Sequence, residues 1–250
     1  MRLQRLSPKI QHYHFATCSS TQDEARRLIA KSSDWFMCTA ESQTHGRGRQ
    51  GRSWSHAQGN LAVTFAMNIE ANDAVRFLLG FAVNLHRWVA QRTSKSVYIK
   101  WPNDIIVEGK KLSGMLGEYD HQLGWFLLGL GLNTINSPTL EDDRNLSISL
   151  KDLSIPEQEI SSLLYIMQDW LRGLLHGPSL EECAKHAQER GFPLNSVMDV
   201  VSGDKRLHGT YEGLTADGCL KLRDGRNVLH MLHAGDVENC RWENLYASRN

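Results

Sequence analysis

The most unusual stretch of the sequence is residues 46–54, which read Gly-Arg-Gly-Arg-Gln-Gly-Arg-Ser-Trp. Its three glycines let the backbone approach a ligand closely. Its three arginines carry planar forks that match phosphate and carboxylate oxygens, and Trp54 offers a flat aromatic face. The pattern therefore predicts a ligand in which a nucleotide is joined to an acid. A flexible arginine-glycine RNA-binding segment is the alternative, and it is disfavoured because the pattern occurs once, between ordered-looking segments.

A second stretch with possible chemistry is Lys100-Trp101-Pro102-Asn103-Asp104, followed closely by Lys110-Lys111-Leu112-Ser113-Gly114. A lysine held on a hairpin can neutralise an α-phosphate and a carboxylate together, and Lys111 is placed for that role. Asp104 lies beside a turn, where a carboxylate can orient an amine or accept its proton. From these residues alone, a plain surface hairpin remains an equal alternative.

Residues 19–21, Ser-Ser-Thr, precede an acidic and then periodic run to Ile29, which is typical of a helix N-terminus. The exposed backbone N–H groups of such a terminus can bind a polar ligand, although a simple helix cap is the better reading of these residues alone. The sequence contains no Walker A motif, H-E-x-x-H motif, nucleophile elbow or protein-kinase set. His45 precedes the glycine-rich stretch and is interpreted as a loop-shaping residue.

The bulk composition excludes several classes of protein. The chain has 250 residues, with 28 basic and 28 acidic side chains and 41% hydrophobic residues, so it has no overall polyanion-binding charge. Its five cysteines form no C-x-x-C pair, so we predict neither a metal site nor a disulfide framework, and we expect buried thiols in a reducing compartment. Without a signal-peptide pattern or a run of about 18 apolar residues, a cytoplasmic protein outside the membrane is expected.

The elements that must position these residues indicate an α+β fold, with a mixed or antiparallel sheet flanked by helices. Strands are predicted over 10–16, 35–40, 60–69, 97–100, 105–107, 111–118 and 124–132. Helices are predicted over the run that follows Thr21 and ends at Ile29, and over 73–92, 156–175 and 179–190. Residues 134–154 form a polar connection. After Pro193, short β-rich segments separated by Gly-Asp and Asp-Gly pairs predict a small β-barrel. We therefore expect a catalytic domain over 1–192 and a barrel domain over 193–250.

Taken together, the two motifs resemble the catalytic domain of biotin–protein ligases. The resemblance continues at residues 129–133, Gly-Leu-Gly-Leu-Asn, and at Ser20-Thr21, and it follows the order of the family from about residue 10 to the end. It implies a class II synthetase-like ligase domain with a C-terminal SH3-like barrel. It also implies two steps: biotin and MgATP give biotinyl-AMP and pyrophosphate, and a lysine of a carrier domain then takes the biotin and releases AMP.

The resemblance also implies the roles of individual residues. The catalytic residues would be Lys111, Asp104 and Arg49, with Arg49 retaining the reactive adenylate. The biotin-binding residues would be Ser20, Thr21, Gln22, Gln43, Gly46, Arg47, Gly48, Arg49, Lys111 and Gly114. The nucleotide-binding residues would be Arg47, Arg49, Arg52, Trp54, Asn103, Lys111 and Asn133. The glycine-rich stretch would act as a mobile loop that excludes water from the adenylate.

Three positions depart from the family pattern. Ser19 stands where Asp is frequent, Gln22 where Asn is common, and His45 where a small residue is usual, so the contact of Gln22 with biotin is less secure than that of Gln43. The resemblance implies ATP, Mg²⁺ and biotin as ligands and the biotin carboxyl carrier domain of acetyl-CoA carboxylase as partner. The chain has no room for the helix-turn-helix domain of the repressor-type members, so DNA binding is not expected. A homodimer is left open.

Two rival functions remain for this chain. One is a lipoate or octanoate ligase of related architecture, which the second motif disfavours. The other is a non-catalytic biotin-binding adaptor, which the presence of Lys111, Arg49 and Asp104 disfavours.

Overall fold

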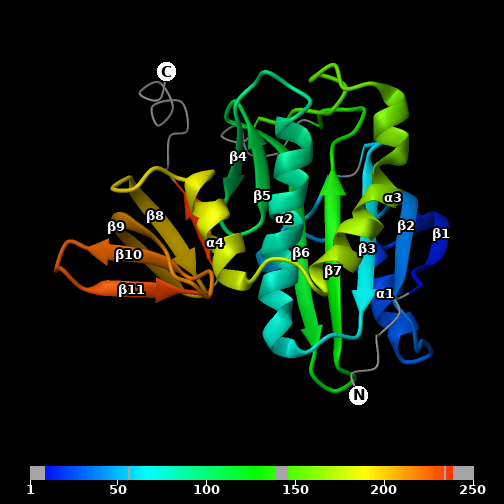
Figure 1. Ribbon diagram of the computed structural model, residues 1–250, viewed down its shortest axis with the longest axis horizontal. Helices are drawn as coiled ribbons and strands as arrows, with labels where there is room; N and C mark the ends of the chain where they lie inside the picture. Colours follow the sequence, from blue (N-terminus) through cyan, green and yellow to red (C-terminus); the bar gives the residue numbers. More distant parts are fainter. Residues whose placement is uncertain (1–8, 56, 139–145, 234, 239–250) are drawn as a thin grey trace. The chain divides into compact units, whose positions relative to one another are not determined.

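The computed structural model describes residues 9–55, 57–138, 146–233 and 235–238 (Figure 1). Within them the chain forms two compact units. One combines the chain up to Leu78 with Leu112–Gly177, and the other combines Leu79–Lys111 with the chain from Pro178 onward. The sequence-based boundary between residues 192 and 193 stays a prediction.

The first unit contains a mixed β-sheet, as predicted. Its strands, in spatial order, are β1 (Gln11–Cys18), β2 (Phe36–Gln43), β3 (Leu61–Met67), β7 (Trp125–Leu132) and β6 (Lys110–Asp120). The β1 and β2 strands pair in parallel, and the remaining neighbours pair antiparallel. Buried apolar residues dominate β2, β3 and β7, as expected for strands covered on both faces.

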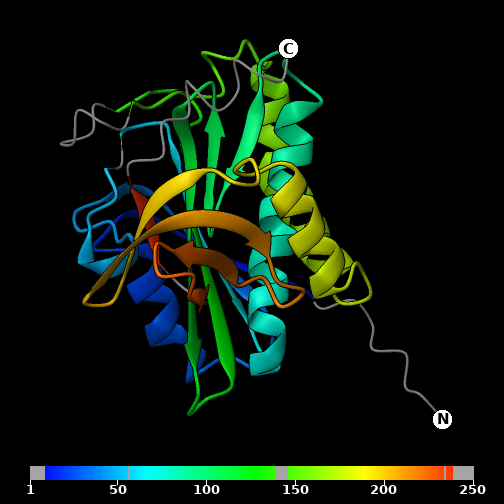
Figure 2. The ribbon, with the colours of Figure 1, turned by 90° about the vertical axis from the view of Figure 1, so that its left-hand side faces the viewer.

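Helices cover both faces of this sheet. Figure 2 shows α1 (Thr21–Ile29, blue) on one side and α3 (Glu157–Leu174, yellow-green) on the other. The α1 helix buries one apolar stripe against the sheet. The core cluster beneath it consists of Ala25, Ile29, Phe36, Cys38, Ala66, Trp125 and Leu127. The α1 helix contacts β2, β3 and β7 of this face.

The second unit contains a hairpin, a helix and a small sheet, and α2 (Ala74–Ala90) runs into it. The hairpin pairs β4 (Val97–Lys100) with β5 (Asp104–Val107), and the helix is α4 (Leu180–Glu189). After β5 the chain turns through Glu108 and Gly109, both at positive φ, where a turn was predicted. Among the described residues, no helix is both long and apolar enough to cross a membrane.

The small sheet of the second unit is open, so the predicted closed barrel is wrong. Its strands, in spatial order, are β11 (Leu229–Leu232), β10 (Leu220–Asp224), β9 (Lys205–Leu214), β8 (Val197–Ser202) and β12 (Asp236–Glu238). All neighbours pair antiparallel. The β12 strand returns to pair with β8 and not with β11, so the described residues form an open sheet with β11 and β12 at its edges.

Four of the five cysteines, Cys18, Cys38, Cys183 and Cys219, are free and buried, as predicted. The fifth, Cys240, lies outside the described residues, as do residues 139–145 of the predicted polar connection and the last 12 residues of the predicted barrel domain.

Candidate functional site

A row of small residues forms the floor of the candidate site in the first unit. Thr64 of β3 pairs with Gly129 of β7, and Gly131 lies between Ala62 and Gly114. A Cβ atom on Gly129 would lie 2.6 Å from Oε1 of Gln22, and one on Gly131 would lie 2.2 Å from Cε2 of Trp54. Both glycines are therefore needed where other groups approach the sheet closely.

The N-terminus of α1 faces this floor. Ser20 caps the helix, and its hydroxyl accepts the N–H of Gln22 at 3.2 Å, so the predicted cap is confirmed. Thr21 and Gln22 follow inside the first turn. All three side chains are buried, between 2% and 4% exposed, which is unusual for polar residues unless they are hydrogen-bonded.

A chain of hydrogen bonds joins these residues across the sheet. The Thr64 hydroxyl donates to Oε1 of Gln22 at 3.1 Å, and Thr21 Oγ1 lies 2.9 Å from Thr64 Oγ1. The Thr64 hydroxyl has a single proton, which it donates to Gln22. The Thr21 hydroxyl must therefore be the donor in its bond with the Thr64 hydroxyl. The Gln22 amide in turn donates to Glu118 at 2.9 Å. The chain therefore runs from Thr21 through Thr64 and Gln22 to a carboxylate, and each bond polarises the next.

Gln43, at the end of β2, closes the other side of this network. Its Oε1 accepts the Thr21 backbone N–H at 2.8 Å, and the Thr21 hydroxyl oxygen lies 3.3 Å from the same atom. The bond from the Thr21 N–H fixes the orientation of the Gln43 amide. Its Nε2 lies 3.3 Å from the place that a Cβ on Gly46 would occupy. The structure thus brings Ser20, Thr21, Gln22 and Gln43 together, as the resemblance implies.

The stretch 46–54 forms a small hairpin. The Trp54 N–H donates to the Gly46 carbonyl and the Gly48 N–H to the Arg52 carbonyl, both at 2.8 Å, and Arg47 bridges Ser53. The tip is a short 3-10 turn, Arg49–Gly51, in which Gly51 has φ of 73°. A Cβ on Gly46 would lie 2.5 Å from the Trp54 carbonyl oxygen, so this glycine permits the close crossing of the two arms.

The arginines of the hairpin have different surroundings. Arg47 donates to Asp23 of α1 at 2.8 Å and to Glu118 of β6 at 2.9 Å. Arg49 lies in the turn at the tip, and the Arg52 Nε–H donates to its carbonyl at 3.4 Å. The base of the hairpin is therefore tied to α1 and β6 through Arg47, whereas Arg49 and Arg52 lie at the other end.

Trp54 and Asn133 complete the predicted residues of this unit. The Trp54 indole packs over Gly131. Asn133 is 2% exposed, and its Oδ1 accepts the Asn60 amide at 3.3 Å. Oδ1 of Asn60 also accepts the backbone N–H groups of residues 134–136 at 3.0–3.1 Å. Asn60 therefore shapes the segment that begins at Asn133.

Three further predicted residues, Asn103, Asp104 and Lys111, belong to the second unit. Lys111 Nζ lies 2.8 Å from Asp104 Oδ2, and the two side chains are 26% and 14% exposed. From the sequence, a plain surface hairpin was an equal alternative, and on such a hairpin these two side chains would be more exposed. Asn103 is 8% exposed, and its N–H donates to the Lys100 carbonyl at 3.1 Å. Lys111 and Gly114 both belong to β6.

Sequence reasoning missed four residues that organise the first unit. Thr64 and Glu118 link the α1 N-terminus to the sheet, Asp23 holds Arg47, and Asn60 holds the segment after β7. Of these four residues, only Thr64 gave a signal in the local sequence, because it is a polar residue inside the otherwise apolar strand β3. Cys38 pairs with Thr64 across β2 and β3, but burial raises the pKa of its thiol to about 12, so Cys38 is not a nucleophile here.

Comparisons with known proteins identify the family of this chain. Residues 15–122 match the model of the biotin/lipoate A/B protein ligase family. The chain is 31% identical over 227 residues to a biotin–[acetyl-CoA-carboxylase] ligase of Mycobacterium tuberculosis, covering 87% of this chain and 84% of that one. It is 30% identical over 234 residues to the bifunctional ligase/repressor BirA of Bacillus subtilis, covering 88% of this chain and 71% of that one.

The fold has a solved counterpart in a biotin protein ligase from Aquifex aeolicus, determined in complex with biotin and ATP. The TM-score is 0.72 at 22% identity, and the match covers 91% of this chain and 97% of that one. The chain belongs to the biotin/lipoate A/B protein ligase family, among the biotin protein ligases.

Proposed function

We propose that this protein activates biotin with ATP and transfers it to a lysine of a carrier protein. In the first step, a carboxylate oxygen of biotin bonds to the α-phosphorus of ATP and pyrophosphate leaves. In the second step, the ε-amine of the acceptor lysine attacks the acyl carbon of biotinyl-AMP. An amide forms, AMP leaves, and the amine loses a proton.

The observation that carries the proposal is the buried polar network beside the glycine floor. The ureido group of biotin has one carbonyl and two N–H groups, and it needs both donors and acceptors held away from water. Thr21, Gln22 and Gln43 supply amide and hydroxyl groups of both kinds; Thr64 and Glu118 orient Gln22, and the Thr21 N–H orients Gln43. The small residues of the floor let Gln22 and the Trp54 indole approach the sheet closely, so these two side chains lie directly over the floor beside the network.

The adenylate is assigned to the arginines of the hairpin, to Trp54 and Asn133, and to Lys111 and Asn103. The Lys111 ammonium lies 2.8 Å from the Asp104 carboxylate, so it is already held by one anion. When the α-phosphate and the biotin carboxylate replace that anion, Lys111 neutralises the charge that develops between them. Asp104 is then released to orient the acceptor amine or to take its proton.

We expect Mg²⁺ to arrive bound to the phosphates of ATP. The carboxylates near the predicted residues are already paired with cationic side chains: Asp23 and Glu118 with Arg47, and Asp104 with Lys111. A dedicated metal cage is normally built from carboxylates that lack such partners, whereas Mg²⁺ is often held through substrate phosphates.

The partner we propose is the biotin carboxyl carrier domain of acetyl-CoA carboxylase, because two relatives of this chain carry the name biotin–[acetyl-CoA-carboxylase] ligase. A cytoplasmic location, a possible homodimer and the lack of DNA binding stay predictions from the sequence. Size-exclusion chromatography with light scattering and a DNA mobility-shift assay would test the last two.

One incubation distinguishes the proposed function from its rivals. The purified chain is mixed with MgATP, a carrier domain and either biotin, lipoate or octanoate. Pyrophosphate release and the mass of the carrier are followed, with Lys111→Ala as the matched inactive control. Biotin-dependent release and a biotinylated carrier are expected. Transfer of lipoate or octanoate alone would identify the other branch of the family, and binding of biotin without pyrophosphate would identify an adaptor.

A further inference from the structure

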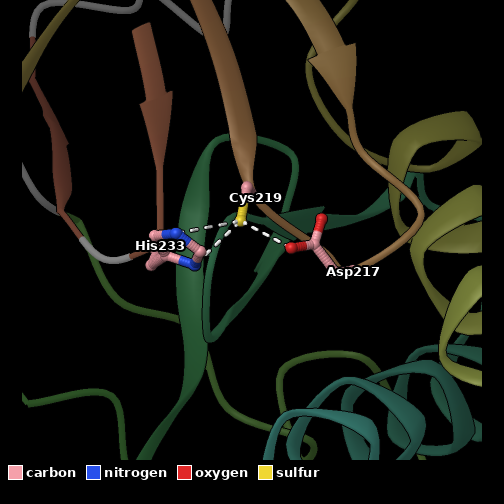
Figure 3. A group of neighbouring side chains, drawn as sticks. All are labelled: Asp217, Cys219 and His233. Carbon is pink, nitrogen blue, oxygen red and sulfur yellow. Dashed lines mark hydrogen bonds between the residues drawn. The ribbon is translucent and has the colours of Figure 1, made fainter.

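The small sheet of the second unit carries a group of side chains that the proposed function does not use. Asp217, Cys219 and His233 lie together at one end of β10 and β11 (Figure 3). Among the described residues, they form the one group of three or more histidine, cysteine or acidic side chains whose donor atoms all lie within 4.8 Å of one another.

The sheet register and one tight turn create this group. Leu220 pairs with Leu232, so the preceding Cys219 and the following His233 face each other just beyond the ladder. The chain reaches Cys219 through a turn in which Gly218 has φ of 83°, and this turn places Asp217 on the same side. Figure 3 shows the Cys219 sulfur between the imidazole and the carboxylate.

The sulfur-to-oxygen distance matches that of a tetrahedral cation site, and the two sulfur-to-nitrogen distances lie just below and just above the range for one. Zn²⁺ binds sulfur at about 2.3 Å and nitrogen or oxygen at about 2.0–2.2 Å, so its ligand atoms lie roughly 3.3–3.7 Å apart. Here the Cys219 sulfur lies 3.4 Å from Oδ2 of Asp217, 3.0 Å from Nδ1 of His233 and 3.8 Å from its Nε2. A thiolate, an imidazole and a carboxylate are all ligands that Zn²⁺ accepts.

A supporting partner holds two of the three ligands. The Thr215 hydroxyl donates to Oδ1 of Asp217, which leaves Oδ2 directed at the sulfur. The Cys219 backbone N–H donates to the same hydroxyl oxygen at 2.9 Å. Such partners orient ligating groups in metal sites and contribute to the affinity.

The site is also connected to the second sequence motif. Gly218, between the two ligands Asp217 and Cys219, accepts the indole N–H of Trp101 at 2.9 Å. Trp101 is 4% exposed and lies three residues before Asp104. A cation bound by Asp217 and Cys219 would therefore fix the turn that anchors Trp101.

We propose that Asp217, Cys219 and His233 bind one Zn²⁺ ion, with water completing the tetrahedron, and that this ion fixes the turn beneath Trp101. Cys219 is 2% exposed, whereas Asp217 and His233 are exposed at the surface. The ion thus has a solvent route on one side and buried sulfur on the other. The ion takes no part in the biotin and adenylate chemistry of the proposed function.

The test uses the full chain, stripped with a chelator and titrated with Zn²⁺ by calorimetry and with Co²⁺ by absorption. We expect one ion per chain, a thiolate-to-cobalt charge-transfer band and a higher midpoint of thermal unfolding with Zn²⁺. His233→Gln should weaken binding at least about 10-fold and remove the zinc-dependent rise in midpoint. This variant tests the site even where Cys219→Ser fails to fold, because His233 is exposed.

Two matched pairs make the result specific. His208→Gln removes another exposed imidazole, 2.6 Å from the Asp199 carboxylate but outside the group, and should leave zinc binding unchanged. Thr215→Val should weaken binding about 10–100-fold, whereas Thr215→Ser keeps the hydroxyl and the affinity. The proposal is overturned if the wild-type chain binds no zinc, if no cobalt–thiolate band appears, or if His233→Gln binds like wild type.

Discussion

Replacing Thr64 by valine tests whether the polar network at the α1 N-terminus binds biotin. The substitution keeps the shape of the side chain and removes only its hydroxyl. Thr64 is fully buried, and this hydroxyl joins Thr21 to Gln22. We expect a higher KM for biotin together with a modest loss of stability.

The size of the effect follows from the partners that remain. The Thr21 hydroxyl can turn to Oε1 of Gln43, which lies 3.3 Å away. Oε1 of Gln22 loses the hydrogen bond that it accepts from the Thr64 hydroxyl. One buried acceptor without its donor costs ~1–3 kcal/mol, which corresponds to about a 5- to 150-fold change in an equilibrium. The KM for biotin should therefore rise on the order of 10-fold, because Gln22 is then oriented through its Nε2 alone, by Glu118 and the Leu127 carbonyl.

Thr39→Val is the matched control. Thr39 is a buried threonine of the neighbouring strand β2, 5% exposed, but it pairs with Val63 and thus faces the other side of the sheet from Thr64. Its hydroxyl lies 2.7 Å from His12 and 2.9 Å from His14. Stability is read from urea unfolding and KM from biotin-dependent pyrophosphate release. The reasoning is refuted if both variants lose similar stability and Thr64→Val keeps its KM for biotin within twofold.

Three further predictions concern the adenylate and the fold. Lys111→Ala should slow biotin-dependent pyrophosphate release on the order of 100- to 1,000-fold, since it removes a charge contact made in the transition state; unchanged single-turnover rates would contradict the role. Arg49→Gly should release free biotinyl-AMP and label lysines of bystander proteins, and labelling confined to the carrier would show that Arg49 does not retain the intermediate. The fold should lose stability as the pH falls from about 6.5 to about 4. Burial, as the main cause, lowers the pKa of both His86 and His186 to about 4, so across that interval the unfolded chain binds protons that the folded chain does not. The loss should reach about 3 kcal/mol for His86, 4% exposed, with a smaller share from the more exposed His186. Urea unfolding at several pH values measures it, and His86→Phe should flatten the dependence.

Much of the fold could be predicted because its signals are local. Helical spacing gave α2 and α3, and turn residues such as Glu108 and Gly109 marked the hairpin after β5. The predicted small β-rich part is present, but the prediction that its strands close into a barrel was wrong. Strand number and turn spacing are local properties, but closure depends on which distant strand the last one joins, and β12 joins β8.

The residues of the candidate site could likewise be predicted only in part from the sequence. Motif residues that are neighbours in the chain could be found from their types. Their partners could not, because Thr64 and Glu118 lie 42 and 96 residues from the Gln22 that they contact. The zinc ligands gave no sequence signal either, because the 14-residue separation of Cys219 and His233 gains meaning only through the register of β10 and β11.

Glu118 shows how the two ends of the predicted ligand depend on one another. One of its oxygens accepts Arg47 at 2.9 Å, and the other accepts Gln22 and Arg26 at 2.9 and 2.8 Å. For Arg47 to reach a phosphate, as the resemblance implies, its guanidinium must leave Glu118. The carboxylate would then keep Gln22 and Arg26, and Arg47 would have to leave Asp23 as well before the hairpin is released. Departure of Arg47 from Glu118 is therefore compatible with the biotin-binding role that we propose for the network, because the same carboxylate accepts Arg47 through one oxygen and Gln22 through the other.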